Sequence, residues 1–261
     1  MQKGYTSERL GFNRKMVAAS ASVTARKNTF HSVAQVDITE PRRLIKAHFE
    51  KTGKKLSFTA YIVYCLAQVV KQHPHLNAFI RRNRLITLED VTVSVLVERE
   101  FDGEKVPEPV SIRAAQNLTY RQISQQIRDA QKNVSKGLGE GSGMGWIRFI
   151  PKFLLKTFVR IAARNIKMAM RYGEVAVTAV GMFSREPVWF IPHGSGTVLI
   201  TVGSIEQKTV FINDRHETRE YLCLTGSFDH DIVDGAPAAR FMNQFLETVG
   251  SGKYLQIDQE T

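Results

Sequence analysis

The sequence predicts a layered α+β or mixed-sheet domain. Segments typical of strands and of helices are both abundant, and they do not alternate regularly as in a parallel α/β protein. The last third of the chain is the richest in strand-like segments. Of the 261 residues, 43% are hydrophobic and 23% are charged, which is the balance of an ordinary globular protein.

The first elements follow from periodicity and capping residues. Residues 29–38 alternate as expected for a strand. Thr39 is expected to cap a helix that runs to about Gly53, with Pro41 in its first turn. Ser57 can cap the next helix, which is apolar on nearly all sides and is therefore expected to be buried.

The remaining elements are shorter. A hairpin is expected around Asn83, and residues 118–134 have the pattern of an amphipathic helix. The turn from Asn213 to His216 is expected to join two strands as a hairpin, and a last helix covers about residues 236–248. The further strand-like segments are 91–98, 106–112, 174–181, 187–192, 197–205, 208–213 and 219–228.

Composition excludes several classes of protein. The N-terminus is polar and basic and lacks the apolar region of a secretory signal, and no run of about 18 apolar residues could span a membrane. Cys65 and Cys223 stand alone in apolar runs, so we expect buried thiols and no metal site. These features favour a cytoplasmic protein.

A candidate catalytic motif follows the last predicted strand. His230 ends that strand, Asp234 lies four residues later, and Gly235 follows where the backbone is expected to bend sharply. An imidazole titrates near neutral pH, and a nearby carboxylate can fix its orientation. Acyl transfer needs such a base and also a donor for the oxyanion. By itself, the motif fits a structural histidine better than a catalytic one.

Longer segments point to a family. Residues 227–247 (SFDHDIVDGAPAARFMNQFLE) resemble the C-terminal signature of the catalytic domain of 2-oxo-acid dehydrogenase acyltransferases, the lipoyl-dependent core enzymes. Chloramphenicol acetyltransferase shares their fold and the His-x-x-x-Asp-Gly element. Residues 178–183 (TAVGMF) are similar to the family's Ser-Asn-Leu-Gly-Met-Phe stretch. Residues 13–39, 56–78 and 197–208 resemble further family segments in the same order.

The resemblance implies an architecture. It implies a mixed β-sheet with packed helices, as in chloramphenicol acetyltransferase, arranged as a two-layer sandwich. We expect one acyltransferase catalytic domain over residues 1–261, with a basic helical insertion at about 146–172. We also expect a stand-alone form, because the sequence contains no lipoyl domain, subunit-binding domain or Ala/Pro linker.

The resemblance also implies roles. His230 corresponds to the general base and Thr178 to the hydroxyl that stabilises the oxyanion, while Asp234 supports the site. Arg14 is the candidate partner of Asp234. The family's active sites lie between the subunits of a homotrimer, with the histidine from one subunit and the hydroxyl from its neighbour. The implied substrate is a coenzyme A (CoA) thioester, with no bound cofactor.

Three differences from the family bear on the acyl acceptor more than on the base. Asp231 stands where the family usually has Arg, Ala179 replaces Asn, and residues 191–195 replace an Asn-Pro-Pro-Gln segment. We therefore leave open a thiol, hydroxyl or amine acceptor. The alternatives are a chloramphenicol-type drug acetyltransferase and a non-catalytic trimeric scaffold or membrane-associated module.

The net charge of +11 is mostly local. A helix is expected from about residue 150 to 172, and residues 148–171 carry seven basic residues and no acidic one, so +4 remains without them. This basic helix could be a packed helix with a solvated charged face. Alternatively, it could bind anionic lipid, the phosphates of CoA or an acidic acyl carrier. Nucleic acid is disfavoured, because no recognised reader motif is present. The basic residues are Arg148, Lys152, Lys156, Arg160, Arg164, Lys167 and Arg171.

Overall fold

A computed structural model describes residues 4–101, 104–132, 152–181, 184, 186–193 and 196–257. The strands are β1 (Thr29–Asp37), β2 (Ala78–Arg81), β3 (Arg84–Thr87), β4 (Val93–Phe101), β5 (Glu104–Ile112), β6 (Val175–Ala179), β7 (Val198–Ile212) and β8 (Arg215–Asp229). The helices are α1 (Phe12–Thr24), α2 (Thr39–Thr52), α3 (Phe58–Gln72), α4 (Tyr120–Lys132), α5 (Lys152–Ala162), α6 (Ile166–Tyr172), α7 (Gly235–Ser251) and α8 (Lys253–Ile257).

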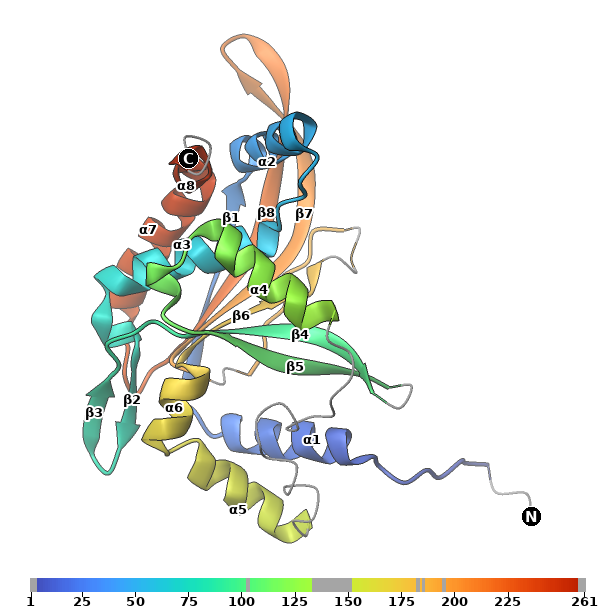
Figure 1. Cartoon of the computed structure of the whole chain (residues 1–261), viewed down its shortest axis with the longest axis vertical. Coiled ribbons are helices and arrows are strands. Elements are labelled where there is room, and N and C mark those ends of the chain that lie inside the picture. The colour runs from blue at the N-terminus through green and yellow to red at the C-terminus, as the bar shows by residue number, and fades with distance from the viewer. Residues whose placement is uncertain are drawn as a thin grey trace.

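One mixed sheet organises the described residues. Its six strands lie in the order β1-β8-β7-β6-β4-β5, and β2 and β3 form a separate hairpin (Figure 1). The β4–β6 and β6–β7 pairs are parallel, whereas the other pairs are antiparallel. The tips of β7 and β8 extend beyond the rest of the sheet as a long hairpin arm (Figure 1). The expected mixed sheet with packed helices is confirmed.

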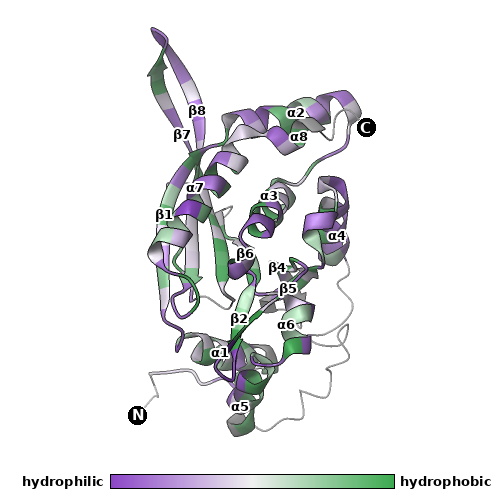
Figure 2. Ribbon diagram, turned by 90° about the vertical axis from the view of Figure 1, so that its left-hand side faces the viewer, coloured by the Kyte–Doolittle hydropathy of each residue, from purple (hydrophilic) through white to green (hydrophobic). Residues whose placement is uncertain are grey.

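The main core lies between one face of this sheet and the helices. Figure 2 shows α3, α4 and α7 on the same side of the sheet. Alternate residues of the central strands contribute to this core, because successive side chains of a strand point to opposite faces. They include Val93, Val95, Val175, Val177, Val198, Ile200, Leu222, Leu224 and Phe228.

Local sequence signals account for several boundaries. Ser57 caps α3 by accepting a hydrogen bond from the Ala60 amide, as expected. Gly53 ends α2 in the left-handed region, where glycine is favoured. Asn83 has a positive φ in the β2–β3 turn, and Asn213 has one in the β7–β8 turn, so both predicted hairpins are confirmed.

Two strand predictions need correction. Residues 197–205 and 208–213 were expected as separate strands, but β7 is continuous because its outer half pairs along its length with β8. Residues 187–192 are not a strand. That segment is fixed through single contacts, in which the Val188 amide donates to Ser204 Oγ and the Trp189 indole donates to the Ala34 carbonyl.

The expected continuous basic helix is wrong. Within the described residues it consists of α5 and α6, separated by residues 163–165. Asn165 has extended backbone angles, and its side chain accepts from the Lys167 amide, which starts a new helix. The predicted cations therefore do not share one face of a single helix, and Arg148 lies outside the described residues.

The two helices α1 and α5 pack on each other away from the main core. Figures 1 and 2 both place them together beyond one end of the sheet. Their shared cluster is small, so part of the apolar surface of α5 stays uncovered: Leu154 is 45% exposed and Ile161 is 64% exposed. In the described part of the chain, no helix has the length and apolarity needed to cross a bilayer. The residues of the cluster are Ala19, Leu155, Phe12, Met16, Phe158 and Val159.

We predict that Gly173→Ala destabilises the fold much more than Gly53→Ala. Gly173 joins α6 to β6 with φ 75° and ψ 167°, a region that is essentially restricted to glycine. A Cβ there would lie 1.9 Å from the Thr92 carbonyl oxygen, whereas a Cβ on Gly53 (φ 65°) would meet nothing within 4 Å. We expect a loss of about 3 kcal/mol or more for Gly173→Ala and about 1 kcal/mol for Gly53→Ala. Denaturant unfolding measures both, and equal losses would contradict the steric argument.

Candidate active site

The turn that carries His230 begins where β8 ends. Asp229 is the last residue of β8, and the amides of Ile232 and Val233 both donate to its carbonyl. The His230 amide donates to the Asn28 carbonyl at 2.7 Å. These bonds fold the chain tightly after the strand and present His230 at the end of the sheet.

The imidazole of His230 is accessible. Its side chain is 54% exposed and stands beside Phe30, with 5.0 Å between ring centroids. His230 Nδ1 lies 3.8 Å from Asp234 Oδ1, which is too long for a direct hydrogen bond. Both groups are thus free to meet a further molecule.

Asp234 and Gly235 begin α7. Asp234 occupies the N-cap position without a side-chain capping bond, and its side chain is 84% exposed. Gly235 is the first residue of α7, its φ is not positive, and a Cβ there would meet nothing. The expected sharp bend therefore does not require glycine. Arg14 lies on α1, and the described residues show no ion pair between it and Asp234.

Thr178 lies in the middle of the sheet, on β6. Val175 and Val177 point into the main core, so Thr178, which is half-buried, lies on the opposite face. Thr178 is in register with Thr201 on β7, which is in register with Thr225 on β8. His230 is five residues beyond Thr225, so strand spacings place it roughly 20 Å from Thr178. One protomer does not bring these two residues together.

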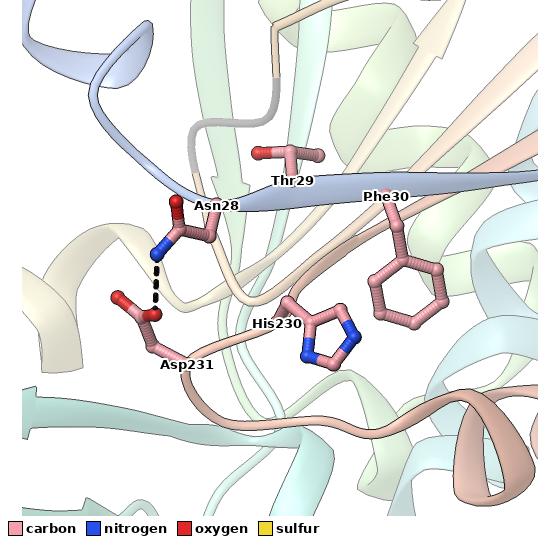
Figure 3. A pocket seen from close by; sticks show the side chains of 5 residues that line it. All are labelled: Asn28, Thr29, Phe30, His230 and Asp231. Atoms are coloured by element: carbon pink, nitrogen blue, oxygen red, sulfur yellow. Dashed lines mark hydrogen bonds between the residues drawn. The ribbon is translucent and has the colours of Figure 1, made fainter.

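A pocket of about 420 Å³ opens beside His230. It is lined by Asn28, Thr29, Phe30, His230 and Asp231, and Figure 3 shows the imidazole next to the Phe30 ring. Asn28 Nδ2 donates to Asp231 Oδ1 at 2.8 Å, which fixes one wall (Figure 3).

A largely buried group of charges includes Asp229, the residue before His230. Lys27 Nζ is 3.0 Å from Asp229 Oδ2 and donates to the Gly196 carbonyl at 3.2 Å. Glu174, only 8% exposed, lies near both charges. Burial raises the pKa of the Glu174 carboxyl to about 7; Lys27 opposes this shift and Asp229 adds to it.

The sequence alone does not identify Lys27, Asn28 and Glu174 as site residues, and Asp231 stands out in it only as a difference from the family. The first two residues directly precede a predicted strand, but their role depends on the pairing of β1 with β8, which brings Thr29 opposite Asp229. Nothing in local periodicity identifies which of several strands will be neighbours.

Comparison with known proteins identifies the family. The model for the 2-oxoacid dehydrogenases acyltransferase (catalytic domain) family matches residues 5–141 and 159–255. The chain belongs to this family. This is a family of acyltransferase catalytic domains, as the resemblance of the C-terminal segment implied.

Relatives and solved structures agree with this assignment. The chain is 26% identical over 235 residues to the lipoamide acyltransferase component of the branched-chain alpha-keto acid dehydrogenase complex of Bacillus subtilis. That match covers 88% of this chain and 47% of the relative, so the chain spans about half the length of the curated relatives it matches.

Two solved structures share the fold over nearly the whole chain. One is the cubic core of the pyruvate dehydrogenase multienzyme complex, with a TM-score of 0.72, 18% identity and coverage of 98% and 96% of the two chains. The other is the dihydrolipoamide acetyltransferase of Azotobacter vinelandii, with a TM-score of 0.71, the same identity and the same coverage. At this identity the similarity establishes the fold.

We predict that Glu174→Gln makes the stability of the protein less sensitive to pH. Because the folded-state pKa of Glu174 is about 7 and the ordinary value is 4.5, the unfolded chain ionises first as pH rises. The Glu174 carboxyl therefore lowers the stability of wild type as pH rises from about 4.5 to 7. Glu174→Gln has no such carboxyl and does not undergo this loss. The advantage of the variant should approach about 3 kcal/mol above pH 7.

The measurement is denaturant unfolding at pH 4.5 and pH 7.5 at one protein concentration. Glu89→Gln, at an exposed position, is the control. A constant difference between wild type and Glu174→Gln across this range would show that the carboxyl has no raised pKa.

Proposed function

We propose that the protein transfers an acyl group between a CoA thioester and a thiol acceptor, with His230 as general base and Thr178 of a second protomer as oxyanion donor. The observation that carries this proposal is a shared spacing. Work on the Azotobacter vinelandii acetyltransferase concerns the catalytic role of a serine, a histidine 52 positions later and an asparagine four positions after that. Thr178, His230 and Asp234 have the same two spacings.

The chemistry uses the accessible imidazole. His230 Nε2 takes the proton of the attacking thiol, and the sulfur bonds to the thioester carbonyl carbon. The carbonyl oxygen becomes an oxyanion, which the Thr178 hydroxyl stabilises by donating a hydrogen bond. When the tetrahedral intermediate collapses, the bond to the CoA sulfur breaks. The imidazolium then returns its proton to the departing thiolate.

A site shared between two copies follows from the separation of the groups. Roughly 20 Å within one protomer excludes a direct joint action on one carbonyl, since both groups must lie within hydrogen-bond reach of the reacting atoms. A homotrimer with a site at each interface, as the family resemblance implies, would join His230 of one copy to Thr178 of the next. Asp234 would support the imidazole in that assembly.

The domain organisation and the acceptor are part of the proposal. We infer one catalytic domain over residues 1–261 with an insertion at about 146–172. The family model leaves residues 142–158 unmatched, which supports part of that insertion. The Bacillus subtilis relative is named a lipoamide acyltransferase, which supports a dihydrolipoyl-type thiol over a hydroxyl or amine.

We predict that His230→Ala lowers turnover about 10²- to 10⁴-fold, because the reaction loses its base. Transfer from acetyl-CoA to free dihydrolipoamide is the assay, and an unchanged circular dichroism spectrum is the control for folding. Turnover within a few-fold of wild type would remove His230 from the mechanism and favour a non-catalytic role for the fold.

We predict that Thr178→Ala lowers kcat about 10²- to 10³-fold with little change in KM, because the hydroxyl acts mainly in the transition state. Mixing this variant with His230→Ala should restore part of the activity, since mixed assemblies contain some interfaces with both groups. Absence of recovery in mixed trimers verified by native mass spectrometry would contradict the shared site.

We further propose that α1, α5 and α6 bind an anionic surface. These helices contain no Asp or Glu, and Lys156, Arg160 and Lys167 are exposed. The exposed apolar side chains of Leu154, Ile161 and Met170 lie on the same pair of helices, α5 and α6. Exposed cations beside exposed apolar groups are the pattern of a helix that lies on anionic lipid.

We predict that vesicles containing anionic lipid bind the protein and that neutral vesicles do not, with binding that weakens as salt rises. Replacing Lys156, Arg160 and Arg164 with Glu should abolish binding. The matched control replaces Lys54, Lys55 and Lys71, which are exposed elsewhere. Absence of binding at low salt would leave these cations solvated or available to CoA or an acidic carrier.

A further inference from the structure

The His230 side chain has few direct restraints. More than half of it is exposed, its distance to Asp234 exceeds hydrogen-bond range, and the neighbouring Phe30 ring is tilted by 60° against the imidazole. A general base must nevertheless be held within a few tenths of an ångström of its working position. Its placement therefore depends on the backbone of residues 229–231.

Two consecutive residues hold that backbone from the neighbouring segment. Lys27 forms an ion pair with Asp229, the residue before His230. The Asn28 side-chain amide donates to the carboxylate of Asp231, the residue after His230. Between these two contacts, the Asn28 carbonyl accepts the His230 amide itself. Asp229 adds a local bond, because its Oδ1 accepts the Asp231 amide at 3.2 Å.

We propose that Lys27 and Asn28 are positioning residues, which hold the His230 turn through Asp229 and Asp231 and thereby aim the imidazole at the acyl group. This inference rests on the proposed role of His230 as base. The Lys27 side chain is 29% exposed and Asp229 is 8% exposed, so the ion pair is partly shielded from water. Shielded pairs are much less weakened by salt and solvent than surface pairs.

The second contact explains the difference at position 231. An acidic residue follows the histidine here, where the family usually has Arg, and its carboxylate meets the Asn28 amide (Figure 3). An arginine at 231 could donate to the Asn28 side-chain oxygen but could not accept from its nitrogen, so the bond seen here requires an acceptor at 231. Asn28 and Asp231 therefore form a matched pair in this chain.

The two contacts should contribute unequally to holding the His230 turn. Without Lys27, the buried Asp229 carboxylate loses its cation and faces Glu174, which is also buried. Removing one partner of a buried pair is costly because a charge is left uncompensated. Asn28 and Asp231 are exposed, so water can replace their bond. We expect the Lys27 contact to dominate.

The test compares Lys27→Met, Lys27→Arg, Asn28→Ala and the control Arg26→Met, which removes an exposed cation one residue away. One readout is hydrogen exchange of the His230 amide by NMR, which requires no activity. The other is the split between kcat and KM for transfer from acetyl-CoA to dihydrolipoamide.

Lys27→Met should expose the His230 amide to exchange and lower kcat by about tenfold or more, with KM changed little, because a misplaced base costs rate rather than affinity. Lys27→Arg should retain most of both properties, Asn28→Ala should show a smaller loss, and Arg26→Met should behave as wild type. If Lys27→Met does not fold, Asn28→Ala with Asp231→Ala provides the same two readouts for the other contact.

Unchanged exchange and kcat in Lys27→Met, or equal losses in Arg26→Met, would overturn the inference. A wild type that is inactive with these substrates would count against the proposed function, and the exchange data alone would then decide the inference. Selective loss of protection at His230 in Lys27→Met would support it, and uniform loss over β1 and β8 would contradict it.

Discussion

The antiparallel pairing of β1 with β8 is the constraint on which the candidate site depends. Its register sets Thr29 opposite Asp229, so the residues before β1 meet the residues after β8. These segments are about 200 positions apart in the sequence, and their contacts include one partly shielded ion pair, one side-chain hydrogen bond and one backbone hydrogen bond. The helices packed on one face stabilise the sheet, whereas the contacts at the ends of β1 and β8 fix the position of the proposed base, His230.

Local signals in the sequence predict local structure well. The turns at Asn83 and Asn213 require positive φ, which asparagine tolerates, and Ser57 has the side chain that an N-cap needs. Signals of this kind use physics that acts over a few residues and do not depend on the rest of the fold. The motif around His230 is a different case, because its catalytic interpretation came from the resemblance of residues 227–247 to a known family.

The features that could not be predicted have two causes: a local signal hidden within a regular pattern, and partners distant in sequence. The spacing of basic and apolar residues continues across residues 163–165, so periodicity gave one helix where the structure has two. Asn165 was the available sign of a new N-cap, but a single polar residue within a regular pattern has many explanations. In the sequence, Glu174 is an ordinary first residue of a predicted strand. It becomes buried near Lys27 and Asp229 only when the sheet forms.

The distance between His230 and Thr178 separates the stability of the chain from its proposed activity. Each protomer contains a complete core, and each holds its own histidine through contacts within the chain. Within one copy the Thr178 hydroxyl and the His230 imidazole lie roughly 20 Å apart, because they stand at different positions along the sheet. In the proposed trimer, folding would prepare both halves of the site in advance, and assembly would bring them together. On this view, Thr178 in the middle of one protomer's sheet is the oxyanion donor, and His230 at the end of a strand in the next protomer is the base. A shift in the protomer interface would therefore change the reaction geometry without changing the fold of either protomer.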